Sequence, residues 1–137
     1  IIDDERPVNN ASNTKRILIC SGKIYFELID LREKSGRDDI AVIRLEQLYL
    51  LDTAGLEKTL SVYADGTPVF YVQDDPENMG ALRFLRIKLG EKVFGRFPFG
   101  GISRPEAASP ATGSASSHRL EQARLLSRAL ELEEPSI

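Results

Sequence analysis

The sequence predicts an α/β domain built on an open, mostly parallel sheet with helices on both of its faces. Short apolar runs of strand length alternate along the chain with longer segments whose apolar residues recur at helical spacing. The first apolar run, 17–20, is continuous rather than alternating, which is typical of strands buried on both faces of a parallel sheet. Right-handed crossovers between successive strands then place the helices above and below the sheet.

Capping residues and turn residues separate the expected strands and helices. Ser21 is expected to cap the first helix, which ends near 35–36, where a glycine can adopt the left-handed conformation. Asp75 is expected to cap the third helix, with Pro76 at its first position, where the missing N–H of proline costs nothing. The expected strands are 17–20, 40–45, 68–72 and 93–97, and the expected helices are 22–35, 56–62, 76–89 and 114–132.

Two segments show no periodicity. Residues 1–14 mix acids, Pro7 and asparagines and are expected to be a linker from upstream domains, which leaves 15–137 as one α/β domain. Residues 97–114 are rich in Pro, Gly, Ala and Ser and are expected to form a stiff loop, since unstructured loops beyond about 12–15 residues are usually functional or disordered. Three apolar side chains predict that 97–111 is an interface in the parent protein: Phe97, Phe99 and Ile102.

Composition narrows the classes of partner. A chain of 137 residues with 42% hydrophobic residues corresponds to one domain with a single core. The 18 basic residues are scattered among 21 acidic ones, so no nucleic-acid partner is expected. No stretch approaches the roughly 20 apolar residues that span a bilayer, so no membrane partner is expected either. Cys20 is the only cysteine, which excludes an internal disulfide and fits a reducing compartment.

The tripeptide Ser21-Gly22-Lys23 is the best chemical signal in the sequence. It stands where the first apolar run meets the first expected helix. Glycine permits close backbone approach to an anion, a helix N-terminus offers free N–H groups, and Lys23 adds a full charge. The alternative is an ordinary capped turn between strand and helix, which is the better interpretation for such a tripeptide met alone, because the rest of a Walker loop is missing.

The carboxyl ends of parallel strands meet at one edge of an open sheet, and ligands bind there. Polar residues that follow the expected strands should therefore converge at this edge: Ser21, Lys23, Glu46, Gln47, Gln73, Asp74 and Asn78. For Glu46 and Gln47 the alternative is that they bond backbone groups at an edge buried against a neighbouring domain or subunit. The predicted site for an anionic effector comprises Ser21, Gly22, Lys23, Gln47 and Asn78.

Other reactive residue types have simpler interpretations. Asp74 and Asp75 precede a proline and an expected helix, where acids act as caps and meet the helix dipole, so no metal site is predicted. His118 is expected to be a first-turn residue that bonds to the preceding loop rather than a general base. Cys20 is expected to be a buried, inert thiol. No catalytic residue is predicted.

Four strings of residues occur in order along most of the chain. They are KRILICSGKIYFEL at 15–28, IAVIRLEQLY at 40–49, VQDDPENMG at 72–80, and PATGS followed by HRLEQ at 110–122. Together these strings resemble the C-terminal domain of the thiamine-diphosphate-dependent decarboxylating component of 2-oxoglutarate dehydrogenase. The chain departs from that family at four positions. Asp74 and Asp75 stand where the family usually has glutamates, and Leu50 and Leu82 also differ from it.

The resemblance implies the transketolase C-terminal fold, a three-layer sandwich on a mostly parallel open sheet. It implies that the full-length enzyme decarboxylates 2-oxoglutarate with thiamine diphosphate and Mg²⁺. The succinyl group then passes to the lipoyl-bearing succinyltransferase component of a multienzyme complex in the tricarboxylic acid cycle. The expected location is the bacterial cytoplasm or the mitochondrial matrix.

The resemblance also implies what this segment contributes. In that superfamily the cofactor lies between two other domains, so this segment is expected to hold no catalytic residue and no cofactor, to complete the subunit and to take part in a homodimer. Some members of the family bind an adenine nucleotide or acetyl-coenzyme A as a regulator near this domain. Another class of function remains as the alternative, a stand-alone nucleotide or acyl-coenzyme A binding module. A self-sufficient hydrolase or transferase is disfavoured because no nucleophile and base pair is visible.

Overall fold

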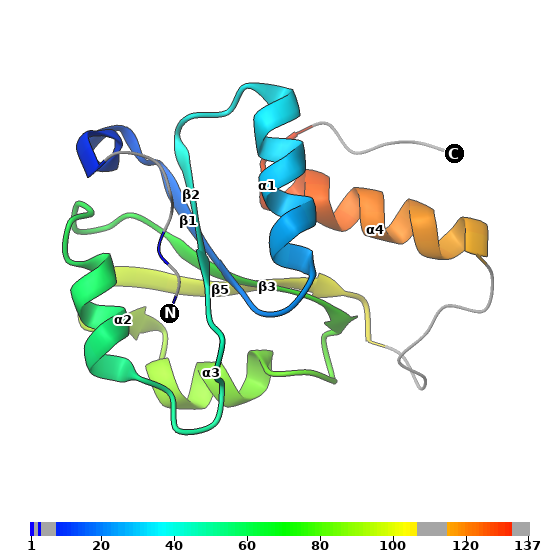
Figure 1. Ribbon diagram of the computed structural model, residues 1–137. Coiled ribbons are helices and arrows are strands. Elements are labelled where there is room, and N and C mark those ends of the chain that lie inside the picture. Colours follow the sequence, from blue (N-terminus) through cyan, green and yellow to red (C-terminus); the bar gives the residue numbers. More distant parts are fainter. Residues whose placement is uncertain (2, 4–7, 107–114, 133–137) are drawn as a thin grey trace.

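A computed structural model describes residues 1, 3, 8–106 and 115–132 as a five-stranded sheet with helices on both faces (Figure 1). The strands are β1 Arg16–Cys20, β2 Ile40–Arg44, β3 Val69–Pro76, β4 Lys92–Val93 and β5 Phe97–Arg104. Their order across the sheet is β2-β1-β3-β5-β4. Only the short β4 runs antiparallel to its neighbour among these strands. The predicted α/β three-layer sandwich with a mostly parallel open sheet is confirmed.

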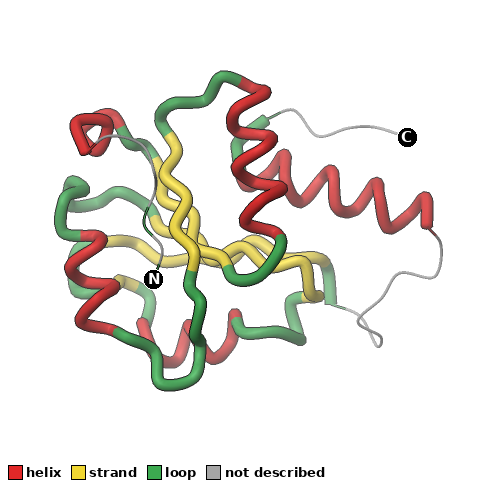
Figure 2. The backbone as a smooth tube through the Cα atoms, viewed as in Figure 1, coloured by secondary structure: helices red, strands yellow, loops and turns green. Residues whose placement is uncertain are grey.

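Helices form the two outer layers of the sandwich, as the tube drawing makes clear (Figure 2). The helices are the 3-10 helix η1 Val8–Asn13 and the α-helices α1 Ile24–Ser35, α2 Thr53–Leu60, α3 Leu82–Leu89 and α4 Ala115–Ala129. Helices α1 and α4 cover one face of the sheet, and α2 and α3 cover the other. None of the helices in the described part of the chain is long and apolar enough to cross a membrane.

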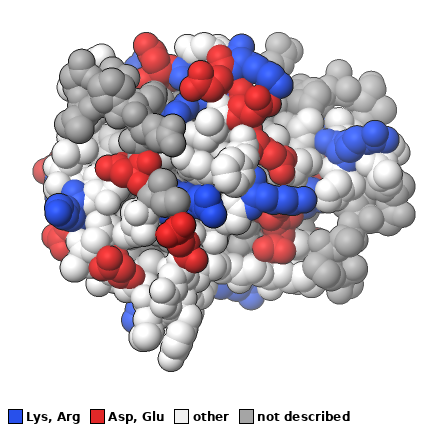
Figure 3. Space-filling view, viewed as in Figure 1, with Lys and Arg blue, Asp and Glu red and all other residues white. Residues whose placement is uncertain are grey.

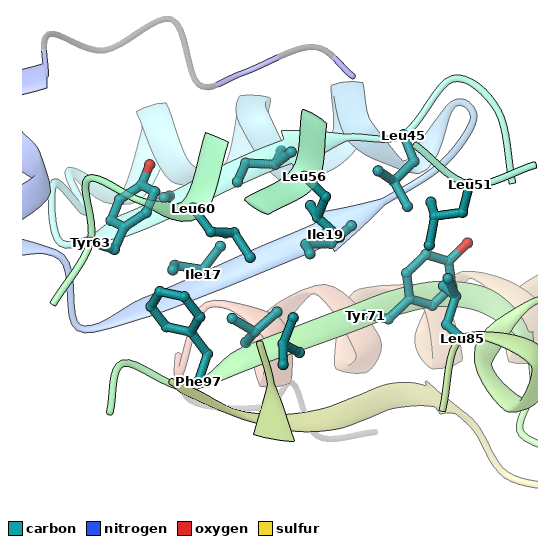
Figure 4. Packing of buried hydrophobic residues seen from close by; sticks show 14 of the residues in the cluster. Ile17, Ile19, Leu45, Leu51, Leu56, Leu60, Tyr63, Tyr71, Leu85 and Phe97 are labelled. Carbon is teal, nitrogen blue, oxygen red and sulfur yellow. The ribbon is translucent and has the colours of Figure 1, made fainter. Parts of the chain in front are cut away.

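Strand β1 supplies both cores because successive side chains of a strand point to opposite faces. Ile17 and Ile19 pack against Leu56 and Leu60 of α2, as Figure 4 shows. The alternate residues of β1 enter the core beneath α1 and α4. All of 17–20 is buried, so the continuous apolar run correctly predicted a strand covered on both faces.

The first helix begins later than its predicted cap. Ile24 is the first residue of α1, and Lys23 occupies the N-cap position without a side-chain hydrogen bond to the helix. Gly22 adopts a left-handed φ of +80° and inserts a turn after β1, so Ser21 lies too early to cap the helix. The predicted glycine stop is confirmed, because Gly36 ends α1 in the left-handed conformation.

The predicted start of the third helix at Pro76 is wrong. Pro76 ends β3 opposite Arg104, and α3 begins only at Leu82. The buried side chain of Gln73 organises the turn between them: its Nε2 donates to the carbonyl oxygens of Pro76 (2.9 Å) and Met79 (2.8 Å), and its Oε1 accepts from the N–H of Leu82 (3.0 Å). These contacts stabilise a turn where the sequence predicted the start of the helix. Asp75 therefore does not cap α3, whose N-cap position is Ala81.

The segment predicted to be a stiff loop contains the strand β5. Residues 97–104 pair in parallel with β3, and Gly101 lets the strand lie close to α3, because a Cβ there would overlap the side chain of Leu82. Phe97 is fully buried in the core, so the prediction that it belongs to an exposed interface is wrong. Ile102 is also buried. Residues 107–111 of that predicted interface lie outside the described residues.

Three smaller differences concern element boundaries. Helix α2 begins three residues earlier than predicted, because the Asp52 carboxylate caps it by accepting a hydrogen bond from the Gly55 N–H (2.8 Å). The predicted strand 93–97 is broken by a turn, and only its first part belongs to β4. Helix α4 begins one residue later and ends three residues earlier than its predicted range of 114–132, and Leu125 is its fully buried leucine.

Candidate functional site

Two pockets flank the carboxyl end of β3, at the sheet edge where the sequence predicted a site. One measures about 470 Å³ on the α3 side, is lined in part by Leu48, Tyr49 and Phe84, and is called the apolar pocket below. The other measures about 450 Å³ on the α4 side and is called the cationic pocket below. Asp74 lines both, so β3 forms the partition between the two pockets.

The predicted anion-binding tripeptide divides between these pockets. Ser21 lines the apolar pocket, whereas Lys23 lines the cationic pocket. Gly22 lies between them with its left-handed φ, and a Cβ added there would meet no atom within 4 Å. The backbone conformation of the turn therefore favours glycine at this position, whereas neighbouring atoms would leave room for a side chain.

Gln47 and Asn78 are exposed and line neither of the two pockets. Gln47 Nε2 donates to the carbonyl oxygen of Tyr49 (2.9 Å), so it satisfies a backbone group, as its alternative interpretation proposed. The structure brings Lys23 together with residues of α4 instead. Of the five predicted effector residues, then, only Lys23 lies in a pocket with other cationic side chains.

Arg104, at the end of β5, is the main site residue that sequence reasoning missed. It is only 4% exposed, and its guanidinium donates to Gln122 Oε1 (2.6 Å) and Glu121 Oε2 (3.2 Å) of α4. Its Nη1 also lies 3.1 Å from His118 Nδ1. Arg104 falls in the range predicted as a loop, where nothing in the sequence distinguishes it from a solvated arginine. His118 contacts the preceding segment, as predicted, but that segment is the strand β5 rather than a loop.

Arg104 and its three α4 partners, His118, Glu121 and Gln122, are called the Arg104 cluster, which extends across the α1 and α4 layer. Gln122 Nε2 donates to Glu27 Oε2 (2.9 Å), so a chain of hydrogen bonds runs from β5 through α4 to α1. Lys23 and Arg119 are exposed and line the same pocket as this cluster. The cationic pocket therefore combines an ordered polar wall with two solvent-facing cations, an arrangement that suits an anionic ligand.

Burial controls the titration of the two reactive groups beside β1. Desolvation by burial is the main cause that raises the pKa of Tyr71 to about 12. Desolvation likewise raises the pKa of Cys20 to about 12, although the positive charge of Arg44 opposes the shift. At neutral pH both groups are protonated. Cys20 is buried, as predicted, and is not a nucleophile.

The donor set does not fit a divalent metal or the diphosphate group that such a metal would hold. Within 8–106 and 115–132, no three side chains of His, Cys, Asp or Glu gather in the way that a metal ion requires. Asp74 and Asp75 are adjacent acids without a third ligand beside them. No chemical step through thiamine diphosphate can be assigned to these residues.

The fold and its carboxyl edge define a three-layer α/β domain with two ligand-sized pockets at that edge. Residues 1–130 match the family described as 2-oxoglutarate dehydrogenase C-terminal. The chain belongs to this family, as the four strings of residues predicted.

Curated relatives extend the comparison. The chain is 37% identical over 129 residues to the 2-oxoglutarate dehydrogenase E1 component of Cupriavidus necator, covering 94% of this chain and 14% of the relative. It is 36% identical over 131 residues to the 2-oxoglutarate dehydrogenase E1/E2 component of Corynebacterium glutamicum, covering 96% and 11%. It is 30% identical over 126 residues to a probable 2-oxoadipate dehydrogenase complex component E1 homolog of Dictyostelium discoideum, covering 92% and 14%. The chain thus spans a small part of each relative.

Proposed function

We propose that this chain is the C-terminal domain of an enzyme that decarboxylates 2-oxoglutarate and transfers the succinyl group to lipoyl groups of a partner succinyltransferase. The supporting observation is the match of residues 1–130 to the 2-oxoglutarate dehydrogenase C-terminal family, together with relatives whose names include the E1 component. Thiamine diphosphate and Mg²⁺ belong to upstream domains of the same polypeptide. The enzyme is a homodimer that works in the bacterial cytoplasm or the mitochondrial matrix.

The domain itself contributes structure and regulation in this proposal. Its two cores make it a self-supporting unit, and its described residues offer no metal ligands for the cofactor. Residues 1–14 act as the connection to the upstream domains. Ala11 of this segment packs against the core of the domain, so the connection is fixed to the domain near its C-terminal end.

The cationic pocket is the effector site in this proposal. An adenine nucleotide or acetyl-coenzyme A presents phosphates, and the solvent-facing cations Lys23 and Arg119 lie where they can receive them. The turn at Ser21 and Gly22 leads into Lys23, which lines the pocket. The Arg104 cluster forms the wall behind it and keeps α4 against the sheet.

Titration calorimetry with adenosine monophosphate and with acetyl-coenzyme A tests the effector site. Lys23→Ala should weaken binding about ten- to a hundredfold, because one charge-assisted phosphate contact contributes on the order of 1.5–3 kcal/mol. Lys58→Ala is the matched control, since Lys58 is also exposed but lies in α2 on the opposite face. Equal affinities of wild type and Lys23→Ala would place the effector elsewhere. Binding without any associated dehydrogenase would favour the alternative, a stand-alone nucleotide or acyl-coenzyme A binding module.

A further inference from the structure

The apolar pocket on the α3 side of β3 has no role in the proposed function. Its volume of about 470 Å³ falls in the range of small-molecule sites, which are mostly apolar with a few polar groups that fix the ligand. Three aromatic side chains line it: Tyr49 from the loop after β2, Tyr71 from β3 and Phe84 from α3. In the space-filling view, uncharged atoms project at the lower edge of the molecule, where the loop after β2 lies (Figure 3). The pocket therefore offers apolar and aromatic surface to a ligand.

The charged side chains that line the apolar pocket are both acids. They are Asp74 and Asp75, and among the described residues that line this pocket none is a lysine, arginine or histidine. The cationic pocket on the other side of β3 is lined by Lys23 and Arg119 instead. The two pockets therefore differ in the sign of the charge that they present, and they select ligands of opposite charge.

Asp75 is the carboxylate that faces the apolar pocket most directly. A Cβ on Gly80 would lie 2.7 Å from both Asp75 Oδ2 and Gln73 Oε1. Because Gln73 Oε1 accepts from the N–H of Leu82 at the start of α3, the Asp75 carboxylate also lies on the α3 side of β3. Glycine at position 80 leaves this carboxylate uncovered, whereas a side chain there would crowd it.

The domain supplies no counter-charge to Asp75. Its side chain is half-buried, and in the part of the chain that the structure describes it forms no ion pair. Gln73 beside it makes three hydrogen bonds to the turn before α3. A carboxylate that loses part of its hydration without gaining a partner carries an energetic cost. A positively charged ligand group offsets that cost.

We propose that the apolar pocket binds a small organic cation, a protonated amine attached to a flat apolar body. The ammonium group donates charge-assisted hydrogen bonds to the Asp75 carboxylate. The rings of Tyr49 and Phe84 contact the apolar body, and aromatic faces also attract a cation near them. This site is separate from the effector site in the cationic pocket, so the inference goes beyond the proposed function and does not depend on it.

Titration of the chain with phenethylammonium chloride, followed by nuclear magnetic resonance, tests the class of ligand. Backbone signals of residues around the apolar pocket should shift and saturate, with a dissociation constant of about 1 mM or lower for a ligand of this size. Phenethyl alcohol, which lacks the charge, and phenylacetate, which reverses it, are the matched ligands. Both should bind at least about tenfold more weakly, because neither brings a cation to Asp75. Equal affinity for the alcohol, or no saturable binding of the ammonium, would overturn the proposal.

Two substitutions that each remove one negative charge test the position of the site. Asp75→Asn keeps the shape of the side chain and should weaken phenethylammonium binding about tenfold. Glu77→Gln is the control and should bind like the wild type, because Glu77 is an exposed acid nearby that lines neither pocket. Circular dichroism checks that both variants fold. Unchanged affinity in Asp75→Asn would overturn the proposal, and so would equal losses in the two variants or shifts confined to the cationic pocket.

Discussion

Arg104 of β5 and Gln122 of α4 are joined by a hydrogen bond of 2.6 Å between Nη2 and Oε1. This contact connects the sheet to a helix that follows it after residues 107–114, which lie outside the described residues. Gln122 passes the connection on to Glu27 of α1. The α1 and α4 layer is thus held to the sheet by a polar network as well as by its apolar core.

Replacing Arg104 with Met should lower the free energy of unfolding by about 2–4 kcal/mol, because it removes the hydrogen bonds that a buried cation makes to half-buried partners on α4. Chemical denaturation measures the loss, and hydrogen exchange should become faster in α4 first. Arg83→Met is the control. Arg83 is exposed and pairs only at the surface with Glu106 (3.1 Å), so its loss should stay below about 1 kcal/mol. Equal effects of the two substitutions would contradict a special role for Arg104.

Gly101→Ala should destabilise the domain by about 1–3 kcal/mol, because the new methyl group would overlap the buried side chain of Leu82. The overlap pushes β5 away from α3, and denaturant unfolding measures the cost. Gly100→Ala is the matched control on the same strand, where the nearest contact is a looser 3.2 Å to the ring of Phe70. A neutral Gly101→Ala would show that Leu82 can move freely.

The Arg37 and Asp39 pair should make stability depend on pH in the acidic range. The hydrogen bond from Arg37 holds the pKa of Asp39 below its usual value, so the folded state favours the ionised carboxylate. The stabilisation is therefore present above the unfolded pKa of about 4 and is lost as pH falls through the folded pKa. Asp39→Asn should be less stable than wild type at pH 7, and the difference should shrink towards pH 2. A difference that is constant with pH would exclude this ionisation as its source.

Cys20 should resist thiol reagents in the folded domain. Its pKa of about 12 leaves almost no thiolate at pH 8, and its side chain is fully buried. Labelling by a disulfide reagent should therefore follow global unfolding and accelerate in denaturant. Rapid labelling under native conditions would mean that the α1 and α4 layer opens much more readily than its packing indicates.

The sequence was sufficient for the fold where local signals agreed with burial. The continuous run at β1 and the glycine stop at Gly36 depend on nearby residues alone, and both predictions are confirmed. Pro76 and β5 were predicted wrongly for a different reason. The turn before α3 is held by hydrogen bonds of the Gln73 side chain. Residues 97–104 form the strand β5 because they pair with β3. Local propensity does not reveal either of these contacts, because both join residues that are not neighbours in the sequence.

Two pockets lie at the sheet edge where the sequence predicted a site, but the sequence did not indicate all of their lining residues. Parallel strands place their carboxyl ends together, so the position of Lys23 followed from the fold class. Arg104 and His118 meet across the fold, from a strand and a helix separated in sequence. Only the packing of α4 against β5 brings them together, and this packing depends on tertiary contacts that the sequence pattern does not contain.

The most direct test of the proposed function is to join this chain to the upstream domains of the Cupriavidus necator 2-oxoglutarate dehydrogenase E1 component, in place of the segment that it matches. The measurement is 2-oxoglutarate turnover with thiamine diphosphate and Mg²⁺. We expect the truncated relative to be inactive, the isolated chain to be inactive, and the joined protein to recover turnover. A joined protein that folds and binds the cofactor but shows no more turnover than the truncated relative would contradict the account.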